Sequence, residues 1–177
     1  MRIPATVVLS SHLSSLALKE AELMSNNEQQ ATTTPAQKPL SFIAPIKQPV
    51  AQHYKELKQI LTHVDGKALD QIGTVHFGRF MFLERDTTST DEVYTKFALF
   101  TAYDGDFKEY VQDFVDVVSE VFDALLEHLV DGESLIPVKK NAQAFADFVD
   151  AHNEKVEVWY SAYPTLSVVQ ILTNAKN

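Results

Sequence analysis

The sequence predicts an α+β fold, and three stretches carry that prediction. Two runs that are rich in aromatic and β-branched residues, 74–84 and 93–103, are typical of β-strands. A longer segment, 106–129, has apolar residues at steps of three and four, which is typical of an amphipathic helix. At 177 residues the chain has room for one domain with a sizeable core, plus a tail.

The first part of the chain is expected to lie outside that domain. Residues 1–24 have the pattern of a weak amphipathic helix and lack the uninterrupted apolar run of a signal peptide. Residues 25–39 are polar and follow neither periodicity, so they are predicted to be a disordered linker. We therefore assign residues 1–40 to a disordered or weakly helical N-terminal extension and linker, and residues 41–177 to the folded domain.

The domain is predicted to begin with a strand at 41–47. Pro45 lies inside this run, and because proline cannot donate to a sheet ladder, this is an edge strand or a strand end. A helix follows at 49–64, where apolar residues form one stripe and Pro49 suits the first turn. The strands 74–84 and 93–103 are joined by a polar loop, so they are predicted to form an antiparallel hairpin.

The second strand is apolar on both of its alternating faces. A sheet that is apolar on both faces has to be covered on both. One face carries Val75, Phe77, Met81 and Leu83, and the other carries His76, Gly78, Phe80 and Phe82.

The remaining elements complete the order β-α-β-β-α-(α)-β. Asp106 is a good N-cap for the helix 106–129, and a further helix is predicted at 140–152. A fourth strand is predicted at 156–163. The last apolar run, 166–172, is a strand or a short helix, and its valines and isoleucine favour the strand.

This order is that of the ferredoxin-like split β-α-β sandwich, in which helices cover one face of a four-stranded antiparallel sheet. The other face is strongly apolar, so a partner is expected to cover it. We expect a homodimer through the sheet faces.

Four runs carry a resemblance to a known group: FIAPIK, GTVHFGRFMFLE, FALFTAYDGDFKEY and WYSAYPTLSV, with helices between them. Over residues 41–173 the chain resembles the dimeric α/β-barrel group, in which two ferredoxin-like sheets pack face to face. The resemblance is to antibiotic-biosynthesis-monooxygenase-like and dye-decolourising-peroxidase-like domains. It implies a homodimer with a barrel cavity, and haem in the peroxidase-like members. The GxxDG motif of those peroxidases is missing, and Tyr103 to Asp106 are explained as a strand end and a helix cap.

Arg79 and His76 are the candidate catalytic residues. A guanidinium inside an apolar strand needs a carboxylate, a cluster of carbonyls or an anionic ligand. Arg79 therefore pairs with an acidic residue of a neighbouring element, anchors a ligand carboxylate, or polarises a bound oxygen species. His76 is either a hydrogen-bonded core or interface histidine, or a base or ligand. On a regular strand the two side chains point to opposite faces.

Aromatic residues suggest where a ligand would bind. The alternatives are packing in the core or the dimer interface, and an aromatic-lined pocket for a small apolar or aromatic molecule. The candidate ligand-binding residues are Arg79, Phe77, Tyr103, Trp159 and Tyr160.

The other histidines are explained without a metal. His128 and His152 lie near predicted helix C-termini, where a histidine cation interacts well with the helix dipole. His128 is the alternative axial ligand of a haem. His53 and His63 are too far apart for an i, i+4 pair, so no metal site is predicted.

Composition excludes several classes of function. The chain has no cysteine, which removes disulfides, thiolate catalysis and iron–sulfur clusters and fits a reducing cytoplasm. A formal net charge of −9 disfavours nucleic-acid binding and adhesion to anionic lipid. No window approaches ~20 consecutive apolar residues, so no membrane span is expected.

Three functions remain open. The first is a small-molecule-binding or accessory protein of the dimeric α/β-barrel type. The second is an oxidoreductase that uses the barrel cavity, either a cofactor-free monooxygenase or a haem-dependent, peroxidase-like enzyme. The third is a structural dimerisation module.

Overall fold

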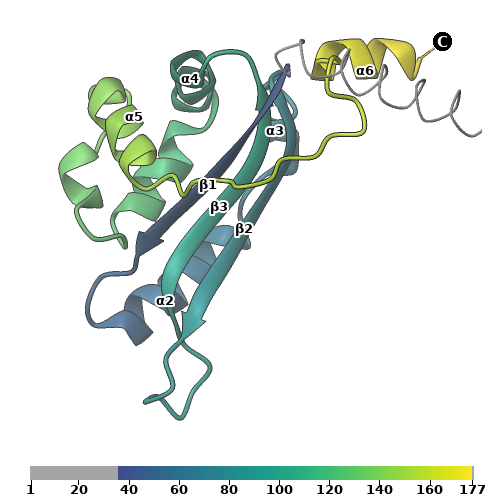
Figure 1. Cartoon of the computed structure of the whole chain (residues 1–177). Helices are drawn as coiled ribbons and strands as arrows, with labels where there is room; N and C mark the ends of the chain where they lie inside the picture. Colours follow the sequence, from purple (N-terminus) through teal and green to yellow (C-terminus); the bar gives the residue numbers. More distant parts are fainter. Residues whose placement is uncertain (1–35, 177) are drawn as a thin grey trace, which may run out of the picture. The chain divides into compact units, whose positions relative to one another are not determined.

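The computed structural model describes residues 36–176 as a mixed α+β unit with an antiparallel sheet, which confirms the predicted class (Figure 1). The predicted extension lies outside the described residues up to position 35. The first strand begins at Gln37, inside the predicted linker. The elements are β1 Gln37–Pro45, α2 Val50–Leu61, α3 Gly66–Leu69, β2 Val75–Arg85, β3 Tyr94–Asp104, α4 Phe107–Leu126, a 3₁₀ turn Gly132–Leu135, α5 Ala142–Ala151 and α6 Val168–Asn174.

The sheet has the strand order β1-β3-β2, and every pairing is antiparallel. The ladder between β1 and β3 runs from Gln37 opposite Asp104 to Pro45 opposite Lys96. β2 and β3 form the hairpin that the sequence predicts, with a register shift between Val75 and Phe77. In this three-stranded sheet β2 has one unpaired edge.

One face of the sheet is covered by α2, α4 and α5 (Figure 1). Alternate strand residues point to this face, as a period of two requires. Burying each large apolar side chain there contributes about 1.5–3 kcal/mol. The strand residues in this core include Leu40, Phe42, Ala44, Phe97, Leu99 and Tyr103.

Helix α4 begins where the sequence predicts and ends earlier. The Asp106 side chain accepts a hydrogen bond from the Lys108 amide at 2.8 Å, which confirms Asp106 as the N-cap. The backbone at Val118 is non-helical (φ −131°, ψ 29°), so the helix bends there. It ends at Leu126, before the predicted end at 129.

The chain after α4 returns to the end of β1. The amide of Lys47 donates to the carbonyl of His128 at 3.0 Å, and the amide of Val130 donates to the carbonyl of Pro45 at 3.0 Å. A Cβ atom at Gly132 would clash with the Leu126 carbonyl, so only glycine fits this turn. These contacts hold His128 next to the start of α2.

The predicted fourth strand at 156–163 is wrong, because this segment is irregular in the structure (Figure 1). Pairing with β1 is limited to a single bridge between Phe42 and Asn153. Backbone bonds to β1 are made at this bridge, where Ile43 donates to His152 and Glu154 donates to Ser41, and side chains add further bonds. The Asn153 Oδ1 accepts from the Ser41 amide at 2.9 Å, and the Gln37 Nε2 donates to the Tyr163 carbonyl at 2.9 Å. The segment therefore follows the edge of β1 without becoming a strand.

The preference for a strand at 166–172 is also wrong, because this run forms most of α6. A capping box starts the helix: the Ser167 hydroxyl accepts from the Gln170 amide, and the Gln170 side chain accepts from the Ser167 amide. This local signal outweighs the β-propensity of Val168, Val169 and Ile171, because that propensity reflects packing in a sheet that is not formed here.

Candidate functional site

Arg79 and Phe77 lie on the sheet face that points away from α2, α4 and α5. Arg79 is exposed, and its guanidinium lies 5.1 Å from the centre of the Phe100 ring. It makes no ion pair within residues 36–176, so the predicted acidic partner is not observed there. Phe77 is 77% exposed. Arg79 therefore makes a cation–π contact with Phe100.

The other candidate ligand-binding residues lie apart from these two. Tyr103 is buried in the core and stacks on Tyr110, with ring centres 4.0 Å apart. Trp159 and Tyr160 lie on the irregular segment that precedes α6, where Tyr160 is 81% exposed. The structure therefore does not bring the five predicted residues together into one pocket within the part of the chain that it describes.

His76 forms a largely buried pair with Asp104, whose side chain is 13% exposed. The register shift beside it changes the regular alternation, and its Nε2 lies 2.7 Å from the Asp104 Oδ1. Because a carboxylate only accepts, Nε2 carries the proton. The second oxygen, Oδ2, accepts from the Val168 amide at 2.7 Å. Both oxygens of Asp104 are therefore satisfied, and the pair joins the sheet to the start of α6.

A groove opens beside this pair, along the free edge of β2. Its volume is about 660 Å³, which lies in the range of sites for small molecules, roughly 300–1,000 Å³. Its walls are mainly apolar and come from β2, α4, α6 and the segment around α3. They include Ile72, Val75, Phe77, Phe80, Phe114, Val168, Val169 and Leu172, with His76 and Asp70 among the polar residues.

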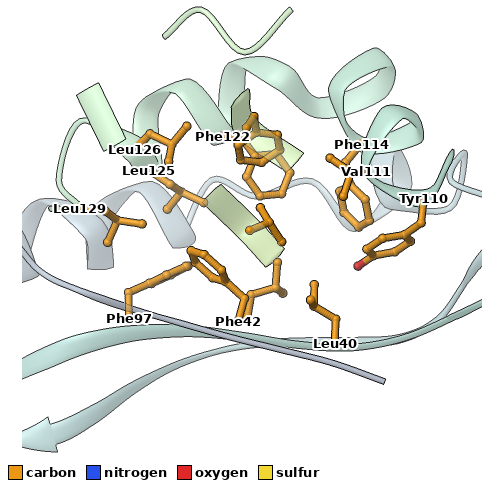
Figure 2. A pocket seen from close by; sticks show the side chains of 13 residues that line it. Leu40, Phe42, Phe97, Tyr110, Val111, Phe114, Phe122, Leu125, Leu126 and Leu129 are labelled. Atoms are coloured by element: carbon orange, nitrogen blue, oxygen red, sulfur yellow. The ribbon is translucent and has the colours of Figure 1, made fainter. Parts of the chain in front are cut away.

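A second cavity lies inside the core, between β1, β3 and α4 (Figure 2). Figure 2 shows Leu40, Phe42 and Phe97 on the sheet side, with Phe122 and Leu125 opposite them. Its volume is about 30 Å³, and its lining is wholly apolar. A water molecule needs two to four polar partners, which this lining lacks. The cavity is a packing defect of the core.

The groove holds a single candidate ligand for haem iron. His76 is the only histidine among the described residues that line the groove, and its side chain is 4% exposed. Its Nε2 is bonded to Asp104, so Nδ1 is the ring nitrogen that would bind iron, and the carboxylate would hold the ring in place. His128, the other candidate axial ligand, lies outside this groove.

The structure brings together three side chains that the sequence analysis kept apart. His53 and Glu56 lie on α2, and His128 follows α4. Their donor atoms all lie within 4.8 Å of one another. Burial lowers the pKa of the His128 imidazole, and the negative charge of Glu56 opposes that shift.

A sequence signal for two of these three residues was present. Residues three apart on a helix share a face, so His53 and Glu56 form a pair of potential ligands on one turn. The pattern of two histidines at i, i+4 does not include this histidine–glutamate pair. The third ligand could not be found from sequence, because the return of the chain after α4 places it.

Comparisons of the chain with family models, curated proteins and solved structures gave no match. Within residues 36–176, no helix combines the length and apolar character that a membrane crossing requires.

Proposed function

We propose that this protein binds a small, mainly apolar molecule in the groove along the free edge of β2. The observation that carries the proposal is the combination of a volume of about 660 Å³ with mainly apolar walls and a buried polar pair at one side. Binding sites for small molecules share this design, since apolar walls supply affinity and a few polar groups fix orientation.

Helix α6 has a defined role in this proposal. Val168, Val169 and Leu172 form one wall of the groove, and the bond from the Val168 amide to Asp104 holds the start of the helix. The oxidoreductase alternative is less favoured, because Arg79 contacts Phe100 and does not line the groove.

The test uses the full-length protein and the fluorescent probe 1-anilinonaphthalene-8-sulfonate, an aromatic anion with a large apolar surface. Leu172 is 56% exposed, so Leu172→Trp fills the groove without disturbing the core. We expect this variant to weaken binding of the probe by at least about tenfold, which corresponds to 1.4 kcal/mol.

The matched control places the same indole elsewhere. Val158 is 84% exposed and does not line the groove, so Val158→Trp should bind the probe as the wild type does. Equal probe affinity in wild type and Leu172→Trp would refute the groove as the binding site.

A second candidate function is self-association of the ferredoxin-like, dimeric-barrel kind. The strand order β1-β3-β2 with a segment following the outer edge of β1 is compatible with that topology. Phe77 and Met81 are exposed on the same face of β2, on either side of Arg79, and solvent-exposed apolar patches mark interaction sites. The proposed partner is a second copy, with the two open sheet faces in contact.

Sedimentation of the full-length protein tests this candidate. We expect a dimer for the wild type and a monomer for Phe77→Asp, because a carboxylate buried between two sheets lacks a partner. Tyr160→Asp changes an equally exposed aromatic residue on the irregular segment and should leave the dimer intact. A monomeric wild type at high concentration would exclude the dimer.

A further inference from the structure

The side chains of His53, Glu56 and His128 converge on one point between α2 and the end of α4. The Nδ1 atoms of the two histidines are 2.9 Å apart. The Oε2 of Glu56 lies 3.2 Å from the Nδ1 of His128 and 3.8 Å from that of His53. We propose that these three atoms bind a divalent first-row transition metal ion, with Zn²⁺ as the representative ion.

The distances fit one ion. A triangle with these three sides has a circumscribed radius of about 2 Å, which equals the zinc–nitrogen and zinc–oxygen bond lengths of about 2.0–2.2 Å. An ion close to the plane of the three atoms therefore reaches all of them at bonding distance without any movement of the backbone.

The number of protons that the three side chains can share also favours a bound metal cation. A single proton between the two Nδ1 atoms satisfies only that contact, and the Glu56 oxygen then faces a nitrogen whose proton is already used. Protons on both Nδ1 atoms would point at each other. A metal ion accepts all three lone pairs at once, so it satisfies every contact in the cluster.

The neighbouring chain holds each ligand in place. Gln52 donates to the Oε1 of Glu56 at 3.3 Å, which leaves Oε2 facing the histidines. The backbone of His128 is held by the Lys47 amide, and Lys47 itself pairs with Glu133 at 3.1 Å. Partners that orient metal ligands in this way are a regular part of protein metal sites.

Ligand chemistry selects the class of ion. Two imidazoles and one carboxylate suit zinc, copper, nickel or iron, whereas calcium and magnesium prefer oxygen ligands only. Glu56 is 39% exposed, so water can reach the ion and complete its coordination. Three protein ligands with an open position are the pattern of sites that bind or activate a further molecule.

The experiment begins with full-length protein freed of metal by a chelator, dialysed against Zn²⁺ and analysed for zinc content and thermal unfolding. We expect one ion per chain that depends on the cluster. Zinc at about one hundred times its dissociation constant should raise Tm by about 5–10 °C, because the ion joins α2 to the end of α4. Mg²⁺ at the same concentration should leave Tm unchanged.

Substitutions distinguish zinc binding at this cluster from nonspecific zinc binding at other histidines. Glu56→Gln and His53→Ala should each weaken zinc binding by more than about 100-fold, since even changes to the partners of ligands cost 10–100-fold. His63→Ala and His152→Ala remove histidines outside the cluster and should bind as the wild type does. Circular dichroism checks that each variant is folded. Wild-type affinity in folded Glu56→Gln and His53→Ala, or no zinc binding by the wild type, would overturn the proposal.

Discussion

Two histidine–carboxylate groups lie at opposite ends of the sheet, and they differ in how their protons are supplied. Asp104 ends β3 opposite the start of β1, and it accepts from the His76 ring and from the Val168 amide. Beyond the other end of β1, His128 is held against Lys47 and faces His53 and Glu56. At the first group each carboxylate oxygen has its own donor. At the second, the Nδ1 atoms of the two histidines face each other and also face the partly exposed carboxylate of Glu56.

This difference in hydrogen bonding distinguishes a structural pair from a site that could bind a ligand. Both groups contain partly buried histidines and a carboxylate, so residue type and burial do not distinguish them. The number of hydrogen-bond donors available to each acceptor does distinguish the two groups. A buried polar group with a partner stabilises the fold, whereas one without a partner costs free energy unless a ligand binds to it.

The largest expected effect is at the satisfied pair. Asp104→Ala removes the acceptor for His76 and for the start of α6, and each donor that is left without its partner costs about 1–3 kcal/mol. Urea unfolding followed by circular dichroism should show this loss. A loss below about 1 kcal/mol would mean that the pair is not a structural anchor.

A local control accompanies that variant. Ser167→Ala removes only the side-chain cap of α6, and the loss of an N-cap costs about 1 kcal/mol. Asp104→Ala should therefore destabilise the protein clearly more than Ser167→Ala does. Equal losses would indicate that Asp104 acts only as a helix anchor and that His76 contributes nothing.

An intermediate effect is expected at a satisfied neutral pair in the core. The hydroxyls of Thr101 and Tyr110 lie 2.6 Å apart and are buried, and burial raises the pKa of Tyr110 well above its usual range. Tyr110→Phe leaves the Thr101 hydroxyl without its partner, which costs about 1–3 kcal/mol. Thermal unfolding measures this cost, and the double variant with Thr101→Val should recover part of it.

The smallest effect, of opposite sign, is expected at the second group. In metal-free protein Glu56→Gln removes the carboxylate charge that faces two Nδ1 atoms already in contact with each other, so we expect a gain of about 0.5 kcal/mol. The matched change Asp104→Asn should instead destabilise the protein, because its amide nitrogen cannot accept from Val168. Denaturant unfolding of both variants measures whether each change raises or lowers the free energy of unfolding. A loss of stability in metal-free Glu56→Gln would break the comparison.

The sequence predicted correctly those helices and strands that are determined by local patterns in their own residues. The hairpin of β2 and β3, the N-cap at Asp106 and the helices α2 and α5 follow from periodicity and local capping. The fourth strand was wrong: pairing with β1 stops at the bridge to Asn153, and side chains of Asn153 and Gln37 hold the two ends of the segment. A capping box at Ser167 was present in the sequence and was overlooked.

The candidate sites depended on long-range placement, which sequence patterns do not encode. Arg79 was selected because a charge inside an apolar strand needs a partner, and the structure gives it Phe100 from β3. His76 was placed by assuming a regular strand, which the register shift removes. His128 was interpreted as a helix-end residue, and only the return of the chain to β1 brings it to α2.

The strand order has a consequence for the sequence of folding events. β2 and β3 are joined directly by the loop 86–93, whereas β1 must find β3 across α2 and β2, so we expect the hairpin to close first. The bond between Asp104 and Val168 also joins residues that are far apart in the chain, and α6 has no buried residue, so we expect this bond to form after the transition state. Mutations in the hairpin core should then slow folding, and Ser167→Ala should mainly speed unfolding, a division that stopped-flow kinetics can measure. The C-terminal wall of the groove is thus the part of the domain that opens first and closes last.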